Sequence, residues 1–185
     1  MDGCIYVNEI LEELRRNAAQ IKDEELQKTA SSILAAKRVF VAGAGRSGFA
    51  ARAFSNRLMH LGLTAYFAGE PTTPAAREGD LLFIISGSGS TPSLVMMAEK
   101  ARACGASVAT VTIHPDGPVG QCAEAVLCLP GAEKSGQNNT AESVQIMGDA
   151  FEQLSWIVCD AMVHYMREKL GISKEEMYLR HANLE

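Results

Sequence analysis

Serine, threonine and glycine gather in two short segments of this 185-residue chain. The first is AGAGRSG at 42–48, and the second is SGSGST at 86–91. Each follows a short apolar run and precedes a helical pattern. Backbone N–H groups at the start of a helix attract anions, glycine permits close approach, and hydroxyl groups add donors. Two such loops on neighbouring strands predict a pocket that binds one phosphate group.

The hydroxyl groups of the two loops are the candidate phosphate ligands. Any one of them is explained as well by helix capping or a turn, but their convergence in two loops favours phosphate. The predicted phosphate-binding residues, with the loop glycines, are Gly45, Ser47, Ser86, Gly87, Ser88, Gly89, Ser90 and Thr91. The first loop also matches the dinucleotide pattern G-x-G-x-x-G, with Glu70 near the expected acidic position. That match is weak, because the chain offers no second half for a nicotinamide substrate.

A third candidate is a carboxylate on a long helix expected over 141–170. Val144, Met147, Phe151, Leu154, Val158, Ala161 and Tyr165 recur at three and four residues, as one core-facing stripe. Glu152 lies beside this stripe, one turn after Gly148, and a glycine in mid-helix often permits close approach. Glu152 is therefore a candidate general base, and the alternative is a glutamate on a solvated face.

The four histidines carry weaker signals. His60 ends an expected helix, where capping explains it, and His164 is expected on an exposed or interface helical face. His114 precedes Pro115 at a strand end, where it faces the site or serves a turn. His181 lies near the chain end, where nothing local requires a histidine. Glu142, three residues after Asn139, has the spacing of a capping box.

Alternating strands and helices must position these groups. Val-, Ile- and Phe-rich strands are expected near 38–42, 64–68, 81–85, 107–112 and 125–129. Helices are expected at 5–21, 26–36, 47–61 and 91–103, in addition to 141–170. The pattern predicts an α/β fold, a doubly wound sheet of five parallel strands with helices on both faces. Ligands bind beyond the carboxyl ends of such strands, where both loops lie. The polar stretch 131–140 is expected to be an exposed connector or, less simply, a lid.

Composition narrows the function classes. The net charge of −5 and the lack of a basic run argue against nucleic-acid binding, and no apolar stretch approaches the length of a membrane span. The start of the chain lacks the pattern of a signal peptide, and the five cysteines are interpreted as reduced core thiols, so we expect a cytoplasmic protein. No His/Cys/Asp cluster has ligand spacing, so neither a metal nor another cofactor is expected.

Together these segments resemble the sugar isomerase (SIS) domain family along nearly the whole chain, and within it the 6-phospho-3-hexuloisomerases. The matching segments are AGAGRSG at 42–48, RLMH at 57–60, SGSG at 86–89, MG at 147–148, FEQ at 151–153 and HANLE at 181–185. The resemblance implies one domain over 1–185, with N-terminal helices at 1–36, an α/β core of flavodoxin-like topology at 37–140, and C-terminal helices and tail at 141–185.

The resemblance also implies an isomerase that interconverts D-arabino-hex-3-ulose 6-phosphate and fructose 6-phosphate through a cis-enediol, in the ribulose monophosphate pathway of formaldehyde fixation. It implies proton transfer by Glu152, a catalytic His181 that reaches a neighbouring subunit's site, and an Arg46 that steadies the enediolate or the phosphate. Family members often carry an acidic residue where this chain has Ser90. It implies a phosphosugar substrate, and a 3-hexulose-6-phosphate synthase to which the enzyme is functionally coupled.

A homo-oligomer, a dimer or more readily a tetramer, is expected because apolar residues such as Met162, Val163 and Met166 exceed what one small sheet covers. Three other interpretations stay open. They are a SIS isomerase acting on another phosphosugar, a noncatalytic phosphosugar-binding protein, and a dinucleotide-binding protein.

Overall fold

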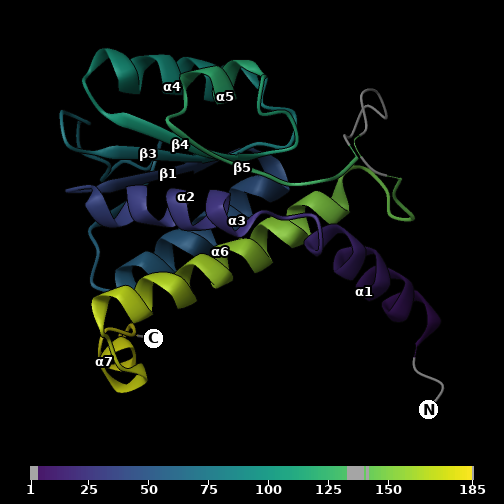
Figure 1. Ribbon diagram of the computed structural model, residues 1–185. Helices are drawn as coiled ribbons and strands as arrows, with labels where there is room; N and C mark the ends of the chain where they lie inside the picture. The colour runs from purple at the N-terminus through teal and green to yellow at the C-terminus, as the bar shows by residue number, and fades with distance from the viewer. Residues whose placement is uncertain (1–3, 133–139, 141, 185) are drawn as a thin grey trace.

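The strands form one all-parallel sheet at the centre of the molecule (Figure 1). This computed structural model describes residues 4–132, 140 and 142–184. The strands are β1 (Val39–Gly43), β2 (Ala65–Phe67), β3 (Leu81–Ile85), β4 (Ser107–Thr112) and β5 (Ala125–Cys128), in the order β2-β1-β3-β4-β5. Val41 pairs with Phe67 on one side and with Phe83 on the other. The order reverses beside β1, so β1 and β3, which carry the two serine–glycine loops, are neighbours.

Helices cover both faces of the sheet. One face carries α2 (Asp23–Ala35), α3 (Gly45–His60) and α6 (Asp149–Leu170), and the other carries α4 (Pro92–Ala103) and α5 (Pro118–Cys122) (Figure 1). The doubly wound α/β fold predicted from the sequence is confirmed. The short α5 was not predicted, because five residues that begin Pro-Val-Gly have no helical periodicity to read.

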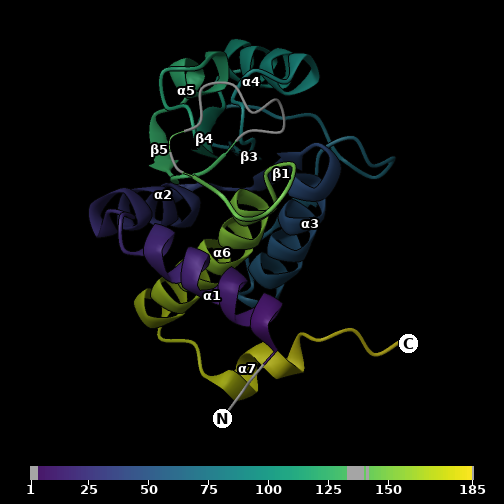
Figure 2. The same cartoon turned by 90° about the vertical axis from the view of Figure 1, so that its right-hand side faces the viewer.

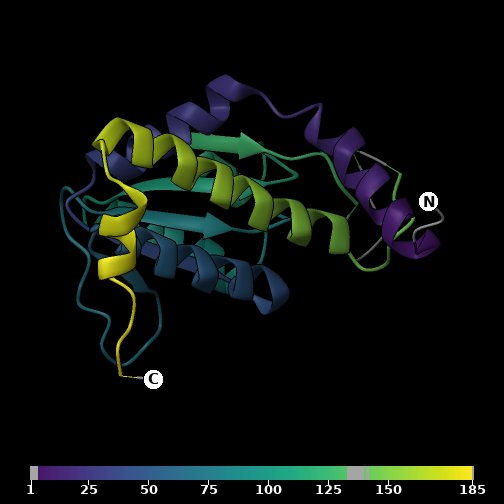
Figure 3. The ribbon, with the colours of Figure 1, turned by 90° about the horizontal axis from the view of Figure 1, so that it is seen from below.

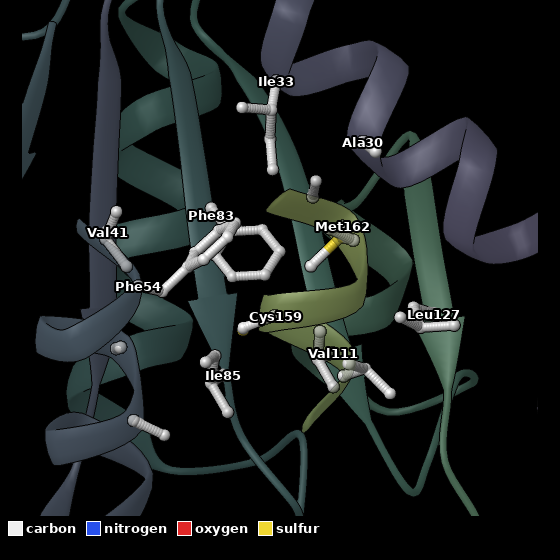
Figure 4. Packing of buried hydrophobic residues seen from close by; sticks show 14 of the residues in the cluster. Ala30, Ile33, Val41, Phe54, Phe83, Ile85, Val111, Leu127, Cys159 and Met162 are labelled. Atoms are coloured by element: carbon white, nitrogen blue, oxygen red, sulfur yellow. The ribbon is translucent and has the colours of Figure 1, made fainter. Parts of the chain in front are cut away.

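Alternate strand residues face two separate apolar clusters, as the period of a β-strand requires. Val41, Phe83 and Val111 pack under α2, α3 and α6, whereas Phe40, Leu82 and Val108 pack under α4 and α5. In the larger cluster the rings of Phe54 and Phe83 lie 5.1 Å apart, close to Cys159 and Met162 of α6 (Figure 4). The strands are buried on both faces, which explains why their sequences are continuous apolar runs.

The start of the long C-terminal helix differs from the prediction. Helix α6 begins at Asp149 and not at residue 141, because Met147 and Gly148 have φ angles of 53° and 81°. A left-handed pair cannot continue a right-handed helix. Gly148 is therefore the N-cap of α6 and not a mid-helix glycine, and Val144 and Met147 are exposed. Of the rest of the predicted stripe, Phe151, Leu154 and Val158 lie in the core and Tyr165 packs against it, whereas Ala161 is half-buried and outside the cluster.

Met162, Val163 and Met166 are buried within the chain, so the prediction that they exceed what the fold of one chain covers was wrong. Helix α2 crosses α6 and covers this part of it, and spacing along α6 alone does not reveal that crossing. Apolar side chains are exposed elsewhere, on α1 (Ile5–Ala18) and along the outer edge of α3 and α6.

The first and last described helices, α1 and α7 (Lys174–Leu179), lie on the same side of the sheet as α6. Helix α1 projects from the body near the start of α6, and α7 lies near the other end of α6 (Figures 2 and 3). The connector or lid expected at 131–140 falls largely on 133–139, outside the described residues. In the part of the chain that the structure describes, no helix is both long and apolar enough to cross a membrane.

Candidate active site

A cavity of about 360 Å³ opens beyond the carboxyl ends of β1 and β3. The two serine–glycine loops and the start of α6 surround it. Its lining consists of Ala44, Gly45, Ser47, Ile85, Ser86, Gly87, Ser88, Thr91, Leu94, Ile113, Ala132, Gly148, Phe151 and Glu152. The volume is sufficient for a single small ligand such as a sugar phosphate.

Four of the five hydroxyl residues predicted to bind phosphate line this one cavity: Ser47, Ser86, Ser88 and Thr91. Helices α3 and α4 begin beside them, with Ala44 and Thr91 as the N-caps. Two helix N-termini therefore face one space, and both favour an anion there. Of the remaining predicted residues, Gly45 and Gly87 line the cavity, whereas Gly89 and Ser90 lie outside its lining. The backbone N–H of Ser90 donates to Ser88 Oγ at 3.3 Å.

Glycine is needed where the first loop joins β1 to α3. A Cβ atom on Gly48 would lie 2.8 Å from the carbonyl oxygen of Gly43, and one on Gly43 would lie 2.9 Å from the carbonyl oxygen of Ser47. No real Cβ atom tolerates such contacts with backbone. The two glycines thus let the first turn of α3 pack directly on the end of β1, which brings Ser47 into the cavity.

Glu152 lies in the first turn of α6, with only 5% of its surface exposed, and lines the cavity. Its Oε2 accepts a hydrogen bond from Nε of Arg46. Arg46 Nε also lies 3.5 Å from Oδ1 of Asp149. The contact with Glu152, aided by the charge of Asp149, raises the pKa of Arg46. A carboxylate held at the cavity wall by a guanidinium group is suited to accept a proton from a bound ligand.

Arg46 itself lies outside the lining of this cavity. Its side chain is 60% exposed and lies in a shallow groove between α3 and α6, which Glu152 joins to the cavity. Phe49, Trp156 and Ile157 line the groove and expose 68%, 48% and 48% of their surfaces. Next to Glu152, the cavity therefore borders an apolar surface that the described residues leave exposed.

His181 lies at the far end of this groove, in a second cavity of about 230 Å³ that also contains Trp156 and Cys159. Its ring stacks on that of His60 with centroids 5.3 Å apart and an angle of 12° between the planes. Arg180 supports this arrangement by donating to the carbonyl oxygen of His60 at 3.2 Å. The structure therefore does not bring His181 together with Glu152 of the same chain.

The buried environment of His60 disfavours its charged form. Burial lowers the pKa of His60 below its ordinary value of 6.5, and the charges of Arg57 and His181 lower it further. From the sequence, the position of His60 at the end of a helix was explained by capping. The stack with His181 was not predicted, because the two residues are far apart in the chain and only the fold joins them.

Comparison with known proteins identifies the family to which this chain belongs. A family model described as the SIS domain matches residues 32–151. The chain belongs to the SIS domain family. It is 44% identical over 180 residues to a Bacillus subtilis protein named 3-hexulose-6-phosphate isomerase, with 97% of both chains covered. A Mycobacterium gastri protein of the same name is 42% identical, with 95% of this chain and 88% of the relative covered.

A solved structure shares the SIS fold over nearly the same extent. It is a Methanococcus jannaschii protein for which a molecular function of 3-hexulose-6-phosphate isomerase was inferred. The TM-score is 0.78 at 33% identity, and the alignment covers 98% of this chain and 97% of the other. The resemblance read from the serine–glycine loops and the terminal segments is thereby confirmed at the level of the family.

Several residues of the SIS cavity were missed by sequence reasoning. Phe151 was assigned to the core stripe, yet its ring forms a cavity wall and would lie 3.2 Å from a Cβ atom on Gly87. Ile113 and Leu94 complete the apolar wall. Their spacing is that of core residues, and a periodicity does not distinguish a core position from a cavity wall. The lining contributed by Gly148 follows from its left-handed conformation at the start of α6.

The other candidates considered as acids or bases lie outside the cavity lining. His114 follows β4, and its backbone N–H donates to Thr112 Oγ1 at 3.1 Å. Glu142 is exposed, and its carbonyl oxygen lies 3.5 Å from a guanidinium nitrogen of Arg16. Glu70, the acidic residue of the dinucleotide pattern, contacts Arg52 instead. Among the described residues, no group of three or more His, Cys, Asp or Glu side chains is arranged to hold a metal ion.

Proposed function

We propose that this SIS domain protein is a 3-hexulose-6-phosphate isomerase, which interconverts D-arabino-hex-3-ulose 6-phosphate and D-fructose 6-phosphate. The observation that carries the proposal is the cavity in which four hydroxyl residues at two helix N-termini face a buried carboxylate, Glu152. The 44% identity with the Bacillus subtilis 3-hexulose-6-phosphate isomerase, over 97% of both chains, supports the choice of substrate.

The reaction moves a carbonyl group from C3 to C2. A base removes the proton on C2 and the C2–C3 enediol forms; a proton is then returned to C3, and the hydroxyl proton passes from the oxygen on C2 to the oxygen on C3. We propose that the carboxylate of Glu152, which lies at the cavity wall, removes the proton from C2 and returns it to C3. Arg46, in contact with Glu152, carries a fixed positive charge that stabilises negative charge developing on the enediolate.

The phosphate group supplies the anchor for this chemistry. In the proposed complex, Ser47, Ser86, Ser88 and Thr91 bind it beside the two helix N-termini. The phosphate takes no part in the bond changes, so its binding energy serves to hold C2 and C3 against Glu152. The apolar wall formed by Ile113 and Phe151, which pack beside Gly87, excludes water from that side of the sugar.

The second catalytic group in this proposal is His181 of a neighbouring subunit, which acts on the oxygens or in ring opening. Glu152 and the second cavity lie at opposite ends of one groove. Cys159, which lines the second cavity, follows Glu152 by seven residues, or roughly 10 Å along α6. A two-fold axis that crosses the groove near Trp156 would exchange its ends and bring the partner's His181 toward Glu152. The exposed Phe49, Trp156 and Ile157 support such a homo-oligomer, a dimer or a tetramer.

The decisive test is a coupled assay with formaldehyde, ribulose 5-phosphate and a 3-hexulose-6-phosphate synthase, which reads the fructose 6-phosphate formed. Formation that depends on this chain is expected, and its absence with an active synthase contradicts the proposal. The synthase supplies the substrate, so functional coupling of the two enzymes in the cytoplasm is part of the proposal. Turnover of a phosphopentose or phosphoheptose in a parallel panel would instead favour another SIS isomerase.

A further inference from the structure

A buried carboxylate on α1 lies outside the cavity and takes no part in the chemistry proposed above. Glu13 has 1% of its surface exposed and lies on the same face of α1 as Leu14 and Asn17, which are also buried. Burying a carboxylate is unfavourable unless it binds donors. Glu13 does so through one oxygen only, because its Oε1 has no hydrogen-bond partner among the described residues.

The donors to Glu13 come from the segment that leads into α6. Its Oε2 accepts from the backbone N–H of Val144 and from Nε2 of Gln145, both at 3.3 Å. Oε1 of Gln145 in turn accepts from Nε2 of Gln153 at 2.9 Å. Gln153 is the residue after Glu152. A continuous set of hydrogen bonds therefore runs from α1, through the segment before α6, to the first turns of α6.

The segment held in this way has no regular secondary structure, and few hydrogen bonds join its own residues. Residues 142–148 form neither helix nor strand, and the segment ends in the left-handed pair Met147 and Gly148. A left-handed methionine is strained and persists only where its surroundings fix it. Immediately after the pair, Asp149 and Glu152 meet Arg46. The position of Glu152 thus depends on where this segment is fixed.

We infer that Glu13 is a positioning residue for the catalytic carboxylate Glu152, acting through Gln145 and Gln153. The inference rests on the proposed function, in which Glu152 removes a proton. The phosphate ligands belong to the loops after β1 and β3, which this set of hydrogen bonds does not touch. Loss of Glu13 therefore misplaces the base and leaves the phosphate site intact. A misplacement of about 1 Å in a catalytic group lowers turnover by up to about a hundredfold.

Four variants test this inference. Glu13→Ala removes the acceptor, and Gln145→Ala removes the middle link without altering the buried face of α1. Glu13→Gln is the conservative variant, because a single amide oxygen can replace the one carboxylate oxygen in use. Glu12→Ala is the matched control, an exposed neighbour of the same type on the same helix.

For Glu13→Ala and Gln145→Ala we expect kcat to fall roughly tenfold to a hundredfold while the KM for the phosphosugar changes by less than about threefold. Glu13→Gln should restore most of the turnover, and Glu12→Ala should resemble the native chain. Backbone amide exchange should accelerate at 149–154 in both impaired variants, although circular dichroism shows them folded.

Two results would overturn the inference. One is a native kcat in Gln145→Ala, which decides the matter if Glu13→Ala fails to fold. The other is a loss of turnover that is fully explained by a smaller fraction of folded protein, while amide exchange at 149–154 stays native. If the native chain itself does not turn over the hexulose phosphate, the proposed function fails instead. Amide exchange and fructose 6-phosphate binding then test the positioning alone, and unchanged exchange at 149–154 in both variants would refute it.

Discussion

In the proposed function, Glu152 and the loop hydroxyls have different tasks at the scale of single residues. The carboxylate is buried and in contact with a guanidinium group, whereas the hydroxyls lie beside helix N-termini, which favour an anion. A base that acts on carbon and an anchor that acts on phosphate affect different kinetic constants. Substitutions at the two places should therefore give opposite kinetic signatures.

Glu152→Gln keeps the shape of the side chain and removes the base. Turnover should fall by about 10²- to 10⁴-fold, the usual contribution of a general base. Fructose 6-phosphate should still bind, because Ser86 and Ser88 remain in place. Kinetics and isothermal titration calorimetry measure the two effects. Near-native turnover would reassign the base, with Glu142 and His114 as the next candidates.

Ser88→Ala removes one donor from the proposed phosphate site. The KM should rise more than kcat falls, because the phosphate is bound about equally in the ground state and the transition state. Ser107→Ala is a suitable control, since Ser107 lies at the other end of the sheet, where it bonds to Glu124. A fall in kcat at constant KM would mean that Ser88 takes part in the chemistry.

At the scale of elements, the contact between β1 and α3 fixes the first loop. Gly48→Ala would place a methyl group 2.8 Å from the carbonyl oxygen of Gly43, and neither backbone can yield without separating helix from strand. We expect a lower melting temperature together with a higher KM, because Ser47 moves with the helix. Thermal unfolding and steady-state kinetics check both. Gly69→Ala, where nothing lies within 4 Å of the added Cβ but the positive φ strains alanine, controls for backbone strain alone and should leave the KM native. A native KM in Gly48→Ala would contradict the link between this packing and the phosphate site.

The stack of His60 on His181 joins the C-terminal segment to α3 and should depend on pH. The folded pKa of His60 lies below its ordinary value of 6.5, so the unfolded chain takes up this proton more readily. The stabilisation is therefore present above pH 6.5 and is lost as the pH falls through the depressed value. Arg57 and His181 oppose protonation, and Asp160 lines the same cavity.

Limited proteolysis or amide exchange of residues 174–184 measures this dependence. Release should increase between neutral pH and about pH 5, the range in which histidine titrates. His60→Phe keeps an aromatic ring for stacking and should weaken the dependence, whereas His164→Gln, on the exposed face of α6, should leave it unchanged. An identical pH dependence in His60→Phe would assign the effect to other groups.

At the scale of the whole molecule, the groove between α3 and α6 raises the question of assembly. Glu152 lines one end of it, and Trp156, which is exposed, also lines the adjoining cavity that contains His181. Helix α1 also exposes Ile5, Tyr6 and Leu11 as it projects from the body (Figure 1). Apolar surfaces of this kind are typical of interfaces.

Mixing Glu152→Gln chains with His181→Ala chains tests the proposed shared site. Each variant alone should be nearly inactive, and the mixture should recover part of the activity because some sites then hold both native residues. Light scattering should give at least a dimer. A monomer at working concentration, or no recovery after proven subunit exchange, would mean that each chain builds its own site.

The sequence by itself determined the sheet and the position of the two serine–glycine loops of this protein. Strands such as Leu81–Ile85 are continuous apolar runs, and the serine–glycine segments follow two of them directly, so both features are local and can be read from neighbouring residues. The convergence of Ser47 and Ser88 on one cavity follows as soon as β1 and β3 are adjacent.

Only the tertiary structure decided the features that depend on contacts between distant residues. Helix α6 begins at Asp149 because the backbone turns left-handed at Met147, in a segment bound by Glu13 from the other end of the chain. The periodicity of α6 continues through this point, since spacing records which side chains are apolar and not where a backbone turns. For the same reason the burial of Met162 under α2 and the stacking of His181 on His60 lay beyond what residue spacing can predict.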